Sequence, residues 1–195
     1  MRKNWAALAL TGMLCLTTFA GIQTVSAETA DSAKQVDIVF THDTHSHLNT
    51  FTTIVDEAEK EVGGFARINT LIQEQKAKNP DTLVIDGGDF SMGTLIQTVF
   101  ETQAAEIRML GYMGCDVTTL GNHEFDYRSK GLANMLNSAA ESGDNLPALV
   151  VCNVDWESME AAGLSEGQQL IRDAFDEYGV SDYVVLEKGD TDIAV

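Results

Sequence analysis

Positive charge is scarce in this sequence of 195 residues. Its 12 lysine and arginine residues stand against 30 aspartate and glutamate residues, which gives a formal net charge of −18 at pH 7. Binding to a nucleic acid backbone requires a cationic surface, so the composition argues against nucleic acid as a partner. A small anionic ligand would also be repelled, unless bound metal ions reverse the electrostatic field at its site.

Long apolar runs are missing after the first 27 residues, so we expect no transmembrane segment in the mature chain. The amino-terminal segment has the pattern of a secretory signal peptide. Arg2 and Lys3 precede an uncharged stretch, and Val25-Ser26-Ala27 offers the small residues of a cleavage site. The apolar core is short for a membrane anchor, which needs about 20 residues. We therefore predict a signal peptide over residues 1–27 and an exported protein, whether periplasmic, cell-surface or extracellular.

Cysteine is rare, and only Cys115 and Cys152 lie beyond the predicted cleavage site. An exported protein could join the two in a disulfide. Both lie beside apolar runs, where buried free thiols are common. We favour buried free thiols and leave the disulfide open.

Residues 28–195 are enough for one domain with its own core. Apolar runs typical of strands alternate with segments of helical periodicity, which is the pattern of a parallel sheet with crossover helices. The predicted fold class is therefore α/β. The expected strands are 38–41, 82–85, 116–120 and 148–152, the expected helices are 64–78, 101–113, 132–139 and 170–178, and a hairpin is expected over 183–195.

Three of the expected strands end in short polar clusters. The clusters are residues 42–47, 87–89 and 121–126, and the first and third hold all four histidines. Ligands of open parallel sheets bind beyond the carboxyl ends of the strands, so these clusters are expected to meet. Asp43 and His45 offer an oxygen and a nitrogen donor from one loop, Asp89 offers a carboxylate and Asn122 an amide oxygen. Such mixed donors suit zinc, manganese or iron better than calcium.

With these residues in this order, the sequence resembles the metallophosphoesterases, and among them the exported 5′-nucleotidase family. The resemblance is carried by Thr41-His42-Asp43-Thr44-His45-Ser46-His47, Gly87-Gly88-Asp89 and Gly121-Asn122-His123-Glu124-Phe125-Asp126. It implies an α/β/β/α sandwich, two divalent metal ions such as Zn or Mn, and a small-molecule phosphoester, most simply a nucleotide, as substrate.

The resemblance also implies a role for each site residue. Asp43 and His45 would bind one metal ion, Asp89 would bridge both, and Asn122 would bind the second. The catalytic pair would be His123 and Asp126, with His123 stabilising charge on the phosphoryl group. This agrees with chemistry, because two close metal ions can activate water, and a carboxylate beside an imidazole raises the pKa of the imidazole.

Other residues of the clusters receive plainer interpretations. His47 is expected to hold its loop, Glu124 to be an early-helix carboxylate favoured by the helix dipole, and Trp156 to lie in a solvated loop. His42 stands where the family more often has asparagine, and Ser46 stands where it usually has glycine.

The family completes its site with histidines from further along the chain, including a Gly-His-x-His type motif, and adds a carboxyl-terminal domain. No histidine follows His123 in this sequence. We therefore expect residues 28–195 to be the amino-terminal portion of a catalytic domain, incomplete at its carboxyl end and weak or inactive alone. A 2′,3′-cyclic phosphodiesterase or nucleotide-sugar hydrolase of the same family, and a non-catalytic acidic exported fragment, are alternatives.

Overall fold

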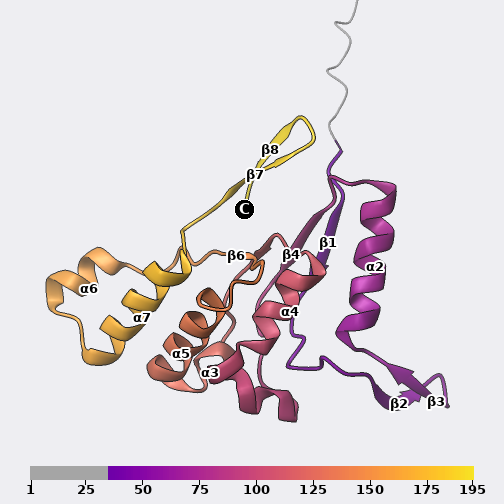
Figure 1. Cartoon of the computed structure of the whole chain (residues 1–195), viewed down its shortest axis with the longest axis horizontal. Coiled ribbons are helices and arrows are strands. Elements are labelled where there is room, and N and C mark those ends of the chain that lie inside the picture. Colours follow the sequence, from indigo (N-terminus) through magenta and orange to yellow (C-terminus); the bar gives the residue numbers. More distant parts are fainter. Residues whose placement is uncertain (1–34) are drawn as a thin grey trace, which may run out of the picture. The chain divides into compact units, whose positions relative to one another are not determined.

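Four short parallel strands form the central sheet, in the order β1 (Ile38–Thr41), β4 (Leu83–Asp86), β5 (Val117–Thr118) and β6 (Ala148–Leu149) (Figure 1). Thr41 pairs with Asp86, Ile85 with Val117, and Thr118 with Leu149. The register brings the carboxyl ends of β1, β4 and β5 to the same edge. The predicted α/β class and parallel pairing are confirmed.

The computed structural model describes residues 35–195, which form one compact unit. The predicted signal peptide of residues 1–27 lies outside the described residues. Within residues 35–195, no helix is both long enough and apolar enough to cross a bilayer.

Amphipathic helices cover the core side of the sheet. The main ones are α2 (Phe65–Lys78), α4 (Ala105–Met113), α5 (Arg128–Ala140) and α7 (Glu166–Tyr178). Their buried residues recur at helical spacing, as with Phe65 and Ile72 in α2 and Ile107 and Leu110 in α4. Burying each such side chain contributes about 1.5–3 kcal/mol, so these faces fix the helices against the sheet.

Strand β1 has one buried and one exposed face. Val39 packs against the hydrophobic core, whereas Ile38 and Phe40 are 55% and 60% exposed. Alternate residues of a strand point to opposite faces, so the core of residues 35–195 lies on the Val39 side at this strand.

The predicted helix 101–113 is wrong as a single element. The structure has a 3₁₀ turn η1 (Leu95–Val99), a short α3 (Phe100–Gln103) and then α4. Ala104, with φ 46°, separates the two helices in the left-handed region. A non-glycine residue rarely adopts this conformation, and alanine gives no local signal of it, so helical periodicity alone could not place the break.

Two elements were not expected. An exposed hairpin is formed by β2 (Phe51–Val55) and β3 (Ala58–Val62), with positive φ at both turn residues, Asp56 and Glu57. The second element is α6 (Trp156–Ala162), capped by the Asp155 side chain, which accepts a hydrogen bond from Ser158 N at 3.0 Å.

The interpretation of Trp156 as part of a solvated loop is wrong. Its ring lies 5.7 Å from that of Phe175 in an edge-to-face contact, and the Arg172 guanidinium lies 5.2 Å from its centroid. These contacts anchor α6 on α7, because aromatic and cation–π contacts each add stability beyond apolar burial.

The carboxyl-terminal hairpin is confirmed as β7 (Val185–Lys188) and β8 (Thr191–Ala194). Lys188 Nζ lies 2.9 Å from Asp116 Oδ1, and the other oxygen of Asp116 accepts a hydrogen bond from Val84 N. Cys115 and Cys152 are both free, as expected, and Cys115 is buried, but the expectation of a buried thiol is wrong for Cys152, which is exposed.

Candidate metal centre

Backbone hydrogen bonds continue past the ends of β1 and β4 and join the first two polar loops. Asp43 N donates to Gly88 O at 3.0 Å, and His45 N donates to Asp89 O at 3.1 Å. Ser46 N then donates to Phe90 O at 2.8 Å. The loops therefore approach each other as extensions of a paired sheet rather than as independent segments.

Several donor residues have unusual backbone conformations. Asp43, His45 and Asp89 have φ of 51°, 45° and 53°. Non-glycine residues in this region cost of order 1–3 kcal/mol each and tend to gather at functional sites. The turn also requires Gly88, at φ 85°, because a Cβ there would lie 2.6 Å from Gly121 N.

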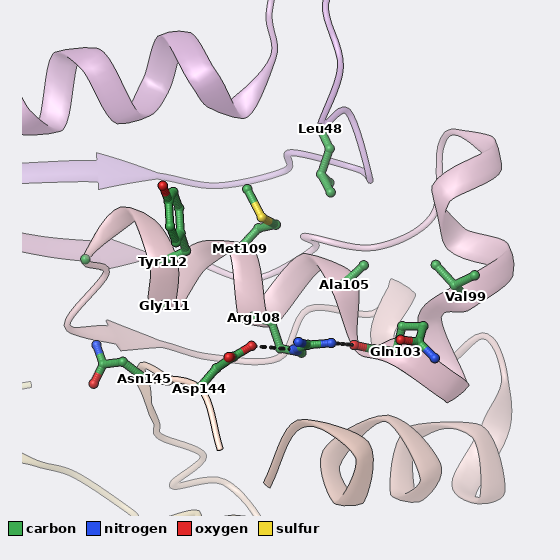
Figure 2. A pocket seen from close by; sticks show the side chains of 11 residues that line it. Leu48, Val99, Gln103, Ala105, Arg108, Met109, Gly111, Tyr112, Asp144 and Asn145 are labelled. Carbon is green, nitrogen blue, oxygen red and sulfur yellow. Dashed lines mark hydrogen bonds and ion pairs between the residues drawn. The ribbon is translucent and has the colours of Figure 1, made fainter. Parts of the chain in front are cut away.

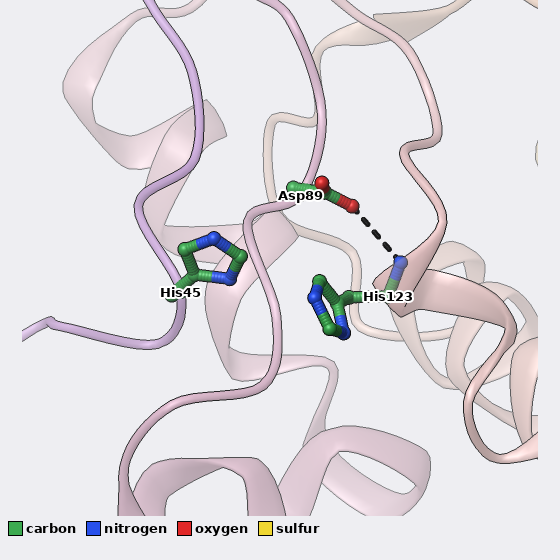
Figure 3. A group of neighbouring side chains, drawn as sticks. All are labelled: His45, Asp89 and His123. Atoms are coloured by element: carbon green, nitrogen blue, oxygen red, sulfur yellow. Dashed lines mark hydrogen bonds between the residues drawn. The ribbon is translucent and has the colours of Figure 1, made fainter.

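The centre of the site is formed by His45, Asp89 and His123. One donor atom from each lies within 4.8 Å of the others (Figure 3). The two imidazole rings meet edge to face, with centroids 5.1 Å apart. Asp89 Oδ1 accepts a hydrogen bond from His123 N at 2.9 Å, which ties the second loop to the third.

The environment of His45 fixes which of its nitrogens can bind a metal ion. Its Nδ1 lies 3.2 Å from the carbonyl oxygen of Ser91. A carbonyl can only accept, so Nδ1 carries the proton and Nε2 keeps its lone pair. Metal-binding histidines commonly donate their other N–H in this way.

Asp43 lies beside this cluster. Its Oδ1 is 3.7 Å from His45 Nε2, and its Oδ2 accepts a hydrogen bond from His42. That hydrogen bond lowers the pKa of the Asp43 carboxyl. Asp43 is therefore an anionic donor at neutral pH.

Asn122 begins the 3₁₀ turn η2 (His123–Phe125) and is exposed. Its side-chain amide has no hydrogen-bond partner among residues 35–195. The amide oxygen therefore remains available to a ligand beside the turn.

His123 and Asp126 form the expected pair. His123 Nδ1 lies 2.8 Å from Asp126 Oδ2. This hydrogen bond raises the pKa of His123, and the negative charges of Asp126, Asp89 and Glu124 add to the effect. Because Nδ1 is held by Asp126, His123 Nε2 is the nitrogen available for a ligand.

Glu124 has contacts at the site that the sequence did not reveal. It lies in the first turn of η2, as expected of an early-helix carboxylate, and it is in addition fully buried and accepts four hydrogen bonds. The donors are Gly121 N (2.7 Å), Asp89 N (3.1 Å), Ser91 N (3.0 Å) and Ser91 Oγ (2.7 Å). No sequence signal pointed to this role, because three of the four donors are backbone groups.

The two departures from the family pattern have local partners. Ser46, fully buried, donates its hydroxyl to Glu106 Oε1 at 2.6 Å, while the hydroxyl of Thr94 donates to Ser46 O. His42 pairs with Asp43. His47 fits the loop-holding interpretation, with its Nδ1 3.2 Å from Thr44 O and its ring 5.1 Å from that of Phe51.

One hollow lies beside the first polar loop, and a separate groove lies along helix α4. The hollow, of about 320 Å³, is lined by residues that include Asp43, His45 and His47. The groove is wider, at about 740 Å³, and Met109 and Tyr112 line it where Arg108 pairs with Asp144 at 2.6 Å (Figure 2). The groove shares no residue with the donor cluster, so its apolar lining is separate from the polar centre.

The donor set fits a divalent transition metal ion. It combines imidazole nitrogens with carboxylate and amide oxygens, which zinc, manganese and iron accept. The Nδ1 atoms of His45 and His123 face oxygen atoms of the protein, which leaves Nε2 of His45 free for a metal ion and Nε2 of His123 free to face an anion bound to that ion. The cluster therefore has the ligand chemistry and the outer hydrogen bonds of a metal centre.

Known proteins with similar sequences are 5′-nucleotidases. The mouse 5′-nucleotidase is 36% identical over 110 residues, covering 55% of this chain and 19% of its own length. The NAD 5′-nucleotidase of Haemophilus influenzae is 29% identical over 140 residues, covering 70% of this chain and 23% of its own length. The chain spans about a fifth of the length of these curated relatives.

Solved structures of 5′-nucleotidases have a similar fold. The 5′-nucleotidase precursor of Thermus thermophilus superposes with a TM-score of 0.64 at 24% identity, over 82% of this chain and 27% of that one. The sequence profile of the calcineurin-like phosphoesterases matches residues 36–191, which include all three polar loops. The chain therefore belongs to the calcineurin-like phosphoesterase family.

Proposed function

We propose that this chain carries the metal centre of a phosphoester hydrolase of 5′-nucleotidase type. The observation that supports the proposal best is the meeting of His45, Asp89 and His123 donor atoms within 4.8 Å. Asp43 and His45 would hold one divalent ion, Asp89 would bridge it to a second, and Asn122 would contact the second.

Two bound divalent ions, zinc or manganese, would supply an activated water and neutralise the phosphoryl oxygens. The residues of this chain would attract the ions and stabilise the charge on the phosphoryl group. The carboxylates Asp43 and Asp89 provide the negative charge that attracts cations into the site. His123, kept protonated by Asp126, donates from Nε2 to a phosphoryl oxygen and stabilises the charge that develops there.

The proposed substrate is a nucleotide. The support comes from the similarity to proteins named 5′-nucleotidases. Because the net charge of −18 would repel an anionic substrate, bound cations are needed to hold it. We also propose that the protein is exported, on the sequence pattern of residues 1–27.

The chain alone is proposed to be a weak catalyst. Residues 35–195 provide Asp43, His45, Asp89 and Asn122 as ligands for two ions, with His123 assigned to the phosphoryl group, whereas two-metal chemistry needs both ions held firmly. Weak occupancy of the second position would remove part of the water activation and charge neutralisation.

The proposal is tested by measuring metal content and turnover of the full chain together. With Mn²⁺ or Zn²⁺ present, we expect saturable metal binding and slow release of phosphate from adenosine 5′-monophosphate. The same assay with a 2′,3′-cyclic nucleotide and a nucleotide sugar separates the related activities. Asp89→Asn should abolish any turnover. A folded chain that binds no divalent ion would contradict the proposed function, and robust turnover would contradict the proposed weakness.

A further inference from the structure

Glu124 lies under the candidate metal centre with no exposed surface. Its side chain is a buried carboxylate whose charge is balanced by hydrogen bonds to four donors. Buried charged groups occur in proteins only when they are paired or fully hydrogen-bonded, and the four donors meet this requirement for Glu124.

The four donors come from both of the loops that follow β4 and β5. Oε2 accepts from Asp89 N and Gly121 N, which joins the two turns directly. Oε1 accepts from the backbone N and the hydroxyl of Ser91. One carboxylate thereby links, by hydrogen bonds, two strand ends that are more than 30 residues apart in the sequence.

The contacts reach two of the three donor residues of the metal centre. Asp89 is contacted through its own backbone N–H, at a residue whose φ of 53° needs support from its surroundings. His45 is reached through Ser91, whose backbone carbonyl accepts the hydrogen bond from His45 Nδ1 while its N–H and hydroxyl donate to Glu124.

We propose that Glu124 is a positioning residue that sets the geometry of Asp89 and His45 for metal binding. It acts through the backbone and Ser91 rather than by touching the ion or substrate. This inference rests on the proposed metal-dependent function of the same site.

The matched variants are Glu124→Gln and Glu124→Asp in the full chain. Glutamine has the same shape but replaces one acceptor oxygen with an amide nitrogen that cannot accept, which leaves without a partner either the two donors of Ser91 or the N–H groups of Asp89 and Gly121. Aspartate keeps the charge but is one methylene shorter, so it cannot reach all four donors. Asp116→Asn is the control, because Asp116 also accepts a backbone N–H but lies at the other end of the sheet.

Two measurements are made on each folded variant. Amide hydrogen exchange of Asp89, Ser91 and Gly121, measured without any metal ion, reports on the hydrogen bonds that these backbone N–H groups donate to Glu124. Calorimetric titration with Mn²⁺ reports on the geometry of the donors. For Glu124→Gln we expect faster exchange at the amides that lose their acceptor, either Ser91 or Asp89 together with Gly121, and metal affinity about 10–100-fold weaker, the usual cost of losing an outer hydrogen bond at a metal site. Glu124→Asp should restore part of the affinity, and Asp116→Asn should leave it unchanged.

Unchanged Mn²⁺ affinity in folded Glu124→Gln would overturn the inference, as would unchanged exchange at the three amides. If the wild-type chain bound no Mn²⁺, the proposed function would fail instead. The exchange data alone would then decide whether Glu124 positions the backbone of the two loops. Should Glu124→Gln not fold, Ser91→Ala provides the second variant. It removes one of the four donors and should weaken Mn²⁺ binding, with no weakening counting against the inference.

Discussion

At the scale of single residues, the metal centre follows from groups that lie next to strand ends. Asp43, His45, Asp89 and His123 could be chosen from the sequence, because each follows an apolar run and carries a group that binds metal or phosphate. Glu124 could not, since its partners are backbone donors brought near by the fold. The proximity of Ser46 to Glu106 was equally invisible, because the two residues are far apart in the chain.

Gly121 has to be glycine because of Asp89. A Cβ on Gly121 would lie 2.0 Å from Asp89 Oδ1. Gly121→Ala should therefore displace this carboxylate and weaken Mn²⁺ binding by about tenfold or more, as measured by titration calorimetry. Gly163→Ala is the control, since it strains a residue with φ 87° but meets no atom within 4 Å. Equal Mn²⁺ affinity in Gly121→Ala and wild type would show that the Asp89 position does not matter.

The pKa of His123 should depend on Asp126. The hydrogen bond between them raises this pKa above its ordinary value of 6.5, so Asp126→Asn should lower it, as followed by NMR of the imidazole protons in the metal-free chain. The raised pKa also means that the pair stabilises the fold fully below pH 6.5 and loses this effect as the pH rises through the folded-state pKa.

Asp56→Asn is the control for that titration, because Asp56 pairs with Lys60 on the exposed hairpin. It should leave the His123 titration where it is in the wild-type chain. A His123 pKa that is the same in Asp126→Asn and wild type would contradict the assigned pairing.

At the scale of elements, periodicity predicted the parallel strands and the long helices, because buried faces dominate their sequences. Strands β5 and β6 are shorter than expected at their carboxyl ends, where residues 119–120 and 150–152 leave the regular ladder. The hairpin β2–β3 was missed because nearly all of its residues are exposed, so burial left no pattern. The break at Ala104 was missed because it depends on backbone geometry rather than on residue type.

Helix α4 carries a buried acid, Glu106, against the first loop. Burial raises its pKa, so the folded chain keeps this proton at pH values where the unfolded chain, with an ordinary pKa of about 4.3, has lost it. Stability should therefore fall as the pH rises from the unfolded pKa to the folded one. Glu106→Gln cannot ionise and should flatten this part of the stability curve, measured by urea unfolding between about pH 4 and 8.

The comparison with Glu101→Gln makes this test specific. Glu101 accepts a hydrogen bond from Asn134 and is not fully buried, so its replacement should leave the pH dependence near that of wild type. If Glu106→Gln kept the full pH dependence of wild type, burial of Glu106 would not be its source.

At the scale of the whole molecule, the main features are the net negative charge and the share of its relatives' length that the chain spans. The net charge of the chain is −18. The chain spans about a fifth of the length of its curated relatives. One face of β1 is exposed at Ile38 and Phe40 within the described residues. The family and fold class were predictable from the three clusters and the alternating elements, whereas substrate choice was not, because no motif in the sequence identifies the group that leaves the phosphate.

Self-repulsion should make the folded chain sensitive to salt. The screening length falls from about 30 Å at 0.01 M salt to about 8 Å at 0.15 M, so added NaCl should raise the Tm. A scan of Tm against NaCl in metal-free buffer tests this, with glucose at matched osmolarity as the uncharged control. A Tm that does not rise with NaCl would show that repulsion between the acidic residues does not limit stability.

The most direct test of the metal centre is anomalous X-ray diffraction from crystals of the full chain grown with zinc. The account predicts an anomalous peak at a bonding distance of about 2.0–2.2 Å from His45 Nε2 and from an oxygen of Asp89. Zinc bound only at other acidic residues, with these two side chains free of it, would contradict the account.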